Sequence, residues 1–274
     1  MSLRHPRSLA ACVLVGVGLI ASVLVSAQGR QGGARGAGAA PATAAWPPRL
    51  DAPAPGEVEV LQVAGNVKVV IGAGANITVQ SGQDGVFVVD TGTAAMSDKV
   101  IAAIKSISPK PLRYIVNTTH FSDYAGGNEK VALTGEIIPW REAGYTAGPQ
   151  GNLATKKKAS IISFYTVFHR LAGEAGAKPL IGEDGWPDNT YSIAQKRLYF
   201  NDEPVVMMHM PGVTDGDTAV LFRKSDVVSV GPLLDLAGYP MIDTVAGGSL
   251  QAEDRKSTRL NSSHVSESRM PSSA

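Results

Sequence analysis

The sequence predicts an α/β protein built as a two-lobed αβ/βα sandwich. Strand-like segments gather in two stretches of the chain, 58–118 and 197–231, and helical patterns separate the two stretches. The chain has 274 residues, of which 44% are hydrophobic, and this is enough apolar material for one sizeable core. No repeat of fixed period divides it further, so two packed layers of strands with covering helices are expected.

The first β-rich stretch opens with short segments that are rich in β-branched residues and broken by Gly or Asn. A turn at 83–85 then leads into 86–90, which is apolar enough to be a buried central strand. The three opening segments, each predicted to be a strand, are 58–63, 66–72 and 76–80.

A helix is predicted over 96–107, where apolar residues recur at helical spacing. Ser97 is its expected cap, Pro109 follows its end, and a further strand is expected over 112–118. These segments give the element order β-β-β-β-α-β.

The second half is expected to begin with a turn at Gly126–Gly127, a short helix and a strand, and then a helical region near 155–172. The lysine run 156–158 is interpreted as the solvated start of that helix. After a loop rich in Gly, Pro and Asp (182–190), the predicted strands are 197–200, 204–210, 218–222 and 226–231.

The amino terminus has the parts of a secretory signal peptide. Basic Arg4 and Arg7 precede an almost wholly apolar run over 9–25, and the small residues at 25–27 predict cleavage after Ala27. The alternative is a membrane anchor, because about 17 apolar residues is the lower limit for a spanning helix. Export with cleavage is the favoured interpretation, which predicts a periplasmic or secreted protein with no membrane attachment afterwards.

Residues 28–56 consist mainly of Gly, Ala and Pro, and are predicted to be a disordered linker. The only cysteine, Cys12, lies inside the signal peptide, so the mature protein is expected to have no disulfide and no thiolate ligand. The near-neutral net charge of +1 gives no reason to expect a nucleic-acid partner.

The carboxyl terminus is interpreted as non-native. Residues 254–264 and 268–274 back-translate to the two parts of a common short-read sequencing adapter, with 265–267 in the place of its index. We therefore expect a folded domain over 57–253 that is incomplete at its carboxyl end, followed by a tail (254–274) outside the fold. A chain truncated in this way could also fail to fold.

Several segments together resemble one family. The segments 76–92, 98–118, 126–130 and 198–222, in this order, are similar to the metallo-β-lactamase superfamily, and most similar to its exported bacterial hydrolases. The resemblance runs over about 58–251. It implies a sandwich of the metallo-β-lactamase type and a zinc-dependent hydrolase site.

The family's first zinc ligands lie between an Asn-Thr pair and a Gly-Gly-Asn triplet. Both anchors are present here, as Asn117–Thr118 and 126–128, at the family's separation. The resemblance then places the ligand positions at Thr119, Phe121, Asp123 and Tyr124, with later ones at Val213 and Pro232.

Only Asp123 keeps a ligand identity. A phenyl ring has no lone pair to donate, a Thr hydroxyl is a poor ligand, and a Tyr must lose a proton with a pKa near ~10 to become a good one. A catalytic zinc site typically needs about three protein ligands, so the usual site is expected to be absent and no cofactor is expected.

A rebuilt metal site remains the alternative, formed by His120, Asp123, Tyr124 and His209. His120 is one residue out of register and is expected to face away from Asp123. His209 is interpreted as a satisfied, partly buried histidine, and no partner is predicted for His169.

Three aspartates near these positions are given structural roles. Asp90 is interpreted as a hydrogen-bonding residue at the end of a buried strand, and Asp215 and Asp217 as turn formers. The sequence has no G-x-S-x-G elbow, dinucleotide fingerprint or phosphate loop, which excludes the chemistries those motifs carry.

Two functions follow. The leading hypothesis is a metal-free binding or regulatory pseudoenzyme, whose pocket of Thr119, Phe121, Asp123, Tyr124 and Val213 takes a small organic molecule or a protein partner. The alternative is a zinc-dependent hydrolase of the ester, thioester, lactone or lactam class, in which Asp123 and His120 are the catalytic candidates. Fold alone does not choose between them.

Overall fold

The computed structural model describes residues 53–136, 158–173, 177–234 and 241–251. Strands form a seven-stranded sheet in the order β1-β2-β3-β4-β5-β6-β7, in which β1 to β4 are antiparallel and β4 to β7 are parallel. Its strands are β1 (Glu59–Ala64), β2 (Val67–Ile71), β3 (Ile77–Gly82), β4 (Gly85–Val89), β5 (Leu112–Asn117), β6 (Ser160–Phe164) and β7 (Asn189–Tyr191).

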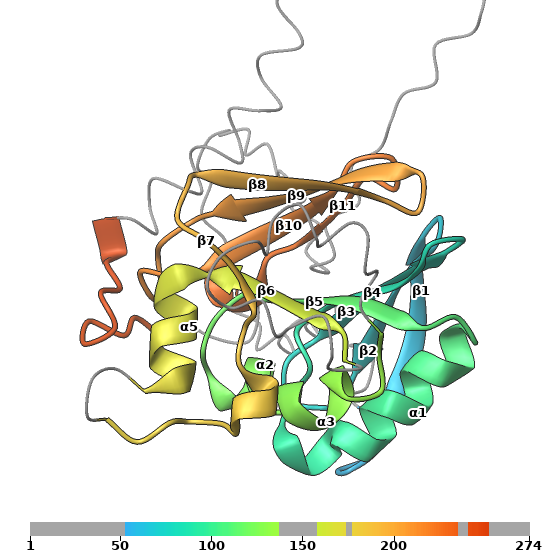
Figure 1. The fold of residues 1–274 in the computed structure, drawn as a ribbon, viewed down its shortest axis with the longest axis horizontal. Helices are drawn as coiled ribbons and strands as arrows, with labels where there is room; N and C mark the ends of the chain where they lie inside the picture. The colour runs from blue at the N-terminus through green and yellow to red at the C-terminus, as the bar shows by residue number, and fades with distance from the viewer. Residues whose placement is uncertain (1–52, 137–157, 174–176, 235–240, 252–274) are drawn as a thin grey trace, which may run out of the picture.

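A second, four-stranded antiparallel sheet has the order β11-β10-β9-β8. Figure 1 shows this smaller sheet lying across the larger one. Its strands are β8 (Gln195–Phe200), β9 (Glu203–His209), β10 (Thr218–Phe222) and β11 (Val227–Ser229).

The helices are short, and most gather at the larger sheet in Figure 1. They are α1 (Ser97–Ile107), α2 (Ser122–Ala125), α3 (Asn128–Ala132) and α5 (Tyr165–Ala172), with single turns of 3₁₀ helix at Ala94–Met96, Glu183–Gly185 and Gly231–Leu233. The described residues thus supply a helical layer and both sheets, and the two-sheet α/β fold is confirmed.

Strand β4 shows that the larger sheet is apolar on both faces. Val86 and Val88 pack in the cluster that α1 and α3 cover, whereas Phe87 and Val89 pack between the two sheets. Because alternate side chains point to opposite faces and both faces are covered, the strand is a continuous apolar run, as predicted.

A buried polar network joins the sheets at one end of the sandwich. The Glu203 carboxylate on β9 accepts a hydrogen bond of 2.6 Å from Gln80 Nε2 on β3, and one of 2.8 Å from Ser225 Oγ. Two backbone N–H groups, of Lys224 and Ser225, donate to the same carboxylate. Glu203 is 1% exposed. These bonds satisfy its carboxylate, which would otherwise be costly to bury.

The predicted order β-β-β-β-α-β is confirmed, but the prediction of a helix near 155–172 was partly wrong. Residues Ser160–Phe164 form strand β6, and helix α5 begins only at Tyr165. Strand β6 lies between two parallel neighbours with all five residues buried, so it has no alternation to distinguish it from helix.

Two smaller predictions were also wrong. Lys158 is not a solvated helix start: its side chain is 4% exposed and its Nζ lies 3.6 Å from the Asp188 carboxylate. Ser97 does not cap α1 but is its first residue, and its hydroxyl donates to the Ala94 carbonyl instead.

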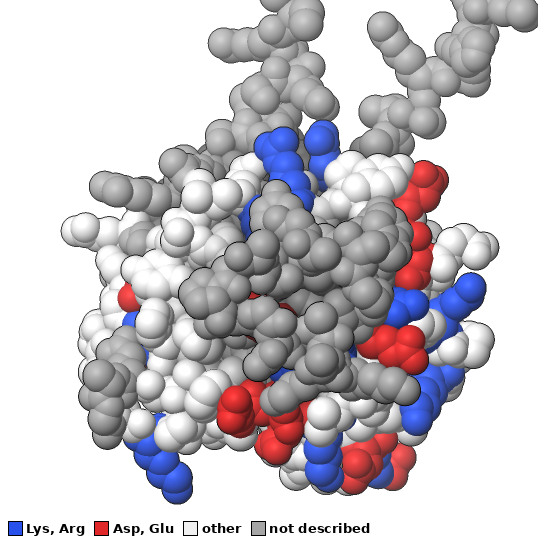
Figure 2. All heavy atoms as spheres, in the orientation of Figure 1, with Lys and Arg blue, Asp and Glu red and all other residues white. Residues whose placement is uncertain are grey.

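The signal peptide 1–27, most of the linker 28–56 and the tail 254–274 lie outside the described residues, as do Lys156 and Lys157. In the described part of the chain, no helix has the length and apolar character needed to cross a bilayer. Figure 2 shows acidic and basic side chains interspersed on the visible face, with neither sign gathered into one broad patch among its described residues.

Candidate functional site

The loop that follows β5 is held by its two predicted anchors. Asn117 and Asn128 exchange side-chain hydrogen bonds of 3.0 and 2.8 Å, and Thr91 Oγ1 donates to Asn128 Oδ1 at 2.9 Å. These three residues are fully buried, so the bonds fix where the loop leaves the sheet and where α3 begins.

Asp90 supports the same loop from the end of β4. Its carboxylate accepts hydrogen bonds from the Thr118 N–H at 2.8 Å and from the Thr118 hydroxyl at 2.7 Å. Burial raises the pKa of Asp90 to about 7, and the bonds from Thr118 oppose this only in part. The structural hydrogen-bonding role predicted for Asp90 is the one observed.

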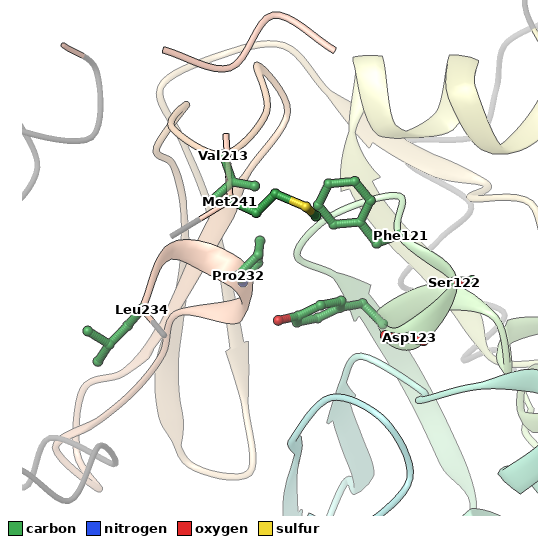
Figure 3. Close-up of a pocket in the computed structure, with 8 residues that line it drawn as sticks. Phe121, Ser122, Asp123, Val213, Pro232, Leu234 and Met241 are labelled. Atoms are coloured by element: carbon green, nitrogen blue, oxygen red, sulfur yellow. The ribbon is translucent and has the colours of Figure 1, made fainter. Parts of the chain in front are cut away.

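A cavity of about 510 Å³ opens beside this loop. One wall is α2 and the residue before it, and the other comes from the loops around the smaller sheet (Figure 3). The eight described residues that line it are Phe121, Ser122, Asp123, Tyr124, Val213, Pro232, Leu234 and Met241.

Five positions that the family resemblance assigns to zinc ligands line this one cavity. They are Phe121, Asp123, Tyr124, Val213 and Pro232. Two distant parts of the chain, 121–124 and 213–232, are therefore brought together as the resemblance implies.

Thr119 does not line the cavity. It is fully buried, and its hydroxyl is among the buried polar atoms without a hydrogen-bond partner. Its neighbour Thr118 packs against Gly231, whose positive φ of 55° and missing side chain allow this close approach.

His120 also lies outside the cavity lining, in agreement with the expected direction of its side chain. Its Nδ1 is buried without a hydrogen-bond partner, and its ring lies 4.7 Å from that of Phe121. Burial lowers the pKa of His120, and the positive charge of Arg170 lowers it further.

His209 has partners of the kind predicted. Its ring stacks on Phe164 with centroids 3.6 Å apart and planes at 4°, and its Nε2–H donates to the Asp215 carbonyl at 2.7 Å. The other predicted histidine, His169, packs on α5 against Tyr165 and Phe168.

The residues at the site do not fit a catalytic zinc ion. The described lining residues offer one carboxylate, from Asp123, beside a phenol, a hydroxyl and five side chains that have no metal-binding nitrogen or oxygen. Across the described ranges, no three His, Cys, Asp or Glu side chains lie close enough to hold a metal. His120, Asp123 and His209 are all described, so they do not converge.

The carboxyl-terminal segment 241–251 contributes to the site in a way the sequence did not indicate. It lies along 212–215, because the Asp243 and Ser249 N–H groups donate to Val213 and Gly212 carbonyls, and the Asp215 N–H donates to Ala246. Met241 thereby reaches the cavity, where Figure 3 shows it pointing toward Phe121.

Asp215 lies in a turn, as predicted, and its side chain is in addition an ion-pair partner. Arg170 on α5 donates to both of its carboxylate oxygens, at 2.6 and 3.0 Å. Burial is the largest single effect and raises the pKa of Asp215, but the hydrogen bonds and charge of Arg170, with smaller contributions from neighbouring residues, together hold that pKa below its usual value. Asp217 does make a local bond, accepting from the Thr214 N–H and hydroxyl at 2.7 and 2.6 Å.

Comparisons with known proteins identify the family and the fold. A family model described as the metallo-beta-lactamase superfamily matches residues 70–262. A metallo-beta-lactamase from Pontibacter korlensis is 17% identical with a TM-score of 0.53, over 75% of this chain and 86% of that one. DIM-1 metallo-beta-lactamase is 14% identical with a TM-score of 0.54, over 76% and 85%.

Other similar structures are longer than the matched part of this chain. MEM-A1, a subclass B3 metallo-beta-lactamase isolated from a soil metagenome library, is 15% identical with a TM-score of 0.44, and the chain spans 58% of its length. No curated protein sequence matches the chain. At these identities the structural likeness shows a shared fold and nothing of substrate.

Proposed function

The chain belongs to the metallo-β-lactamase superfamily, and we propose that it uses this fold as a metal-free binding or regulatory pseudoenzyme. The cavity that lines up with the family's metal positions is the proposed binding site. Its ligand is a small organic molecule or a short protruding segment of a protein partner.

The chemical make-up of the cavity carries this proposal. Five of its eight lining side chains are carbon-rich and unable to ionise: Phe121, Val213, Pro232, Leu234 and Met241. A volume of about 510 Å³ lies within the range typical of small-molecule sites, which are mostly apolar with a few polar groups. Ser122, Asp123 and Tyr124 are those polar groups.

The partners of the histidines favour this function over the metal-dependent hydrolase. A ligand set of His120, Asp123, Tyr124 and His209 would have to release His209 from its stacking on Phe164 and its bond to Asp215. Such a site also needs His120 to turn toward a cavity that it does not line. Hydrolysis of an ester, thioester, lactone or lactam therefore remains the alternative that metal binding would support.

A blocked cavity tests the proposal. Ser122 is exposed on the cavity wall, so Ser122→Trp should fill the space without disturbing the core. Ser106→Trp, on the exposed side of α1, adds the same ring away from the cavity and serves as the control. A soluble fragment library would be screened against each protein by ligand-observed NMR.

We expect fragments to bind the parent and the Ser106→Trp variant and to lose binding in Ser122→Trp. If no fragment binds the parent, or if Ser122→Trp binds the same fragments equally well, the binding proposal is wrong.

We also propose that the protein is exported through its 1–27 segment and acts in the periplasm or outside the cell. Detection of the 1–27 segment on the purified native protein would contradict cleavage.

A further inference from the structure

We propose that the cavity selects small organic cations that carry an apolar or aromatic body. The inference rests on the proposed binding function and specifies the charge of the ligand. It is drawn from the charges and rings that line the cavity.

Asp123 gives the cavity its charge. Among the described residues that line the cavity, it is the only one with a carboxylate side chain, and none is a Lys, Arg or His. Within the described residues, the Asp123 carboxylate makes no hydrogen bond or ion pair, although its backbone carbonyl accepts from the Ala75 N–H. The carboxylate is therefore available to a ligand.

The guanidinium of Arg170 on α5 is engaged by other groups and is not among the described lining residues. Arg170 is committed to both oxygens of Asp215 and to the Ala246 carbonyl at 3.2 Å. His120 is not among the described lining residues either. Among the described lining residues, an anionic ligand would thus meet a carboxylate and no cation, whereas a cationic ligand would meet its counter-ion.

Aromatic rings flank the carboxylate along the chain. Phe121 and Tyr124 are placed two residues before and one after Asp123, and all three residues line the same cavity. The face of an aromatic ring attracts a cation through its quadrupole, and ammonium ligands are recognised by such rings. The Met241 thioether, which points toward Phe121 in Figure 3, adds a polarisable contact for the methyl groups of a substituted ammonium.

Three probes with one phenylpropyl body separate charge from hydrophobic contact. They are (3-phenylpropyl)trimethylammonium, 3-phenylpropan-1-ol and 3-phenylpropane-1-sulfonate, each titrated into the purified protein by NMR. One cation–π contact and one exposed ion pair together correspond to about tenfold tighter binding of the ammonium probe than of the alcohol. The sulfonate should bind most weakly.

Matched variants assign the preference to named side chains. Asp123→Asn should weaken binding of the ammonium probe about three- to fivefold and leave the alcohol unchanged. Asp98→Asn on α1 makes the same change of net charge away from the cavity and should alter neither. Phe121→Leu keeps the apolar contact and removes the ring, so it should weaken binding of the ammonium probe more than binding of the alcohol.

The outcomes separate this inference from the function it rests on. If the alcohol or the sulfonate binds as tightly as the ammonium probe, or if Asp123→Asn behaves like Asp98→Asn, the charge preference is wrong. The binding function would still stand if the parent protein binds those probes and the Ser122→Trp variant does not. Failure of every library fragment to bind the parent overturns both.

Discussion

Arg170 on α5 and Asp215 after β9 form a two-pronged ion pair that also holds the carboxyl-terminal segment. The guanidinium donates to both Asp215 oxygens, at 2.6 and 3.0 Å, and to the Ala246 carbonyl at 3.2 Å. Planar two-point pairing of this kind is the strong form of a charged hydrogen bond. One side chain therefore fixes a helix, a loop and the segment that brings Met241 to the cavity.

Replacement of Arg170 by Met should destabilise the protein by about 1–2 kcal/mol, a figure reduced for the partial exposure of the pair. Urea unfolding followed by circular dichroism measures the change. The exposed pair Lys224–Asp202, with an N···O distance of 2.7 Å, is the control, and Lys224→Met should leave the unfolding midpoint unchanged. Equal effects of both substitutions would contradict the anchoring role of Arg170.

Asp90 should make the stability fall as the pH rises. Its pKa is about 7 in the folded protein against 3.8 for an ordinary Asp, so between these values the folded state holds a proton that the unfolded state has lost. The contribution of Asp90 to the free energy of unfolding should therefore fall as the pH rises toward 7, by at most about 1.4 kcal/mol per pH unit, and stay level above pH 7.

The comparison of parent and Asp90→Asn isolates this contribution. His120, with its lowered pKa, acts in the opposite direction below its ordinary value of 6.5, so the parent curve alone mixes the two. Urea unfolding at pH 5, 6, 7 and 8 should show the parent losing more stability than Asp90→Asn between pH 5 and 7. Parallel curves would show that Asp90 is ionised throughout.

Zinc should not be retained. Purified protein that is loaded with zinc and dialysed should keep well under one equivalent by elemental analysis, because a lone carboxylate cannot hold the ion. Stoichiometric zinc or iron that is lost in Asp123→Asn or His120→Ala would instead support the hydrolase with a rebuilt site.

Restoring ligands at the family positions should create zinc binding. The variant carries Thr119→His, Phe121→His, Tyr124→His, Val213→His and Pro232→Asp around the native Asp123. Except for Thr119, these positions line one cavity, so we expect tight zinc binding by the variant and none by the parent. Affinity should fall about 10–100-fold short of a natural site, since the bonds that orient each imidazole are absent. A folded variant that ignores zinc would show that the loop after β5 is not the family's metal loop.

Local patterns were sufficient to predict much of the fold. The apolar run of β4 and the helical stripe of α1 lie where expected, because each pattern reports directly on burial. Strand β6 was missed since its fully buried residues run straight into α5, and a short apolar run does not distinguish strand from helix. The burial of Lys158 was not predicted because the groups that make it tolerable, the Asp184 carbonyl and the Asp188 carboxylate, lie far along the chain.

The candidate site could be predicted only as far as the resemblance extended. Phe121, Asp123, Tyr124 and Val213 line the cavity as expected. Leu234 and Met241 were not anticipated, since the return of the chain over 212–215 depends on backbone bonds that leave no sequence pattern. The Arg170–Asp215 pair, whose residues are 45 positions apart, likewise leaves no pattern in the sequence.

The buried Glu203 network ties the cavity to the cohesion of the whole sandwich. Phe121 and Asp123 belong to the lobe of the larger sheet, whereas Val213 and Pro232 belong to the other lobe, so a ligand in the cavity touches both. Gln80 and Glu203 join the same two lobes through the core. Occupancy of the cavity and the strength of that junction are therefore thermodynamically linked: a ligand makes the lobes harder to separate, and weakening the junction lowers the affinity for the ligand.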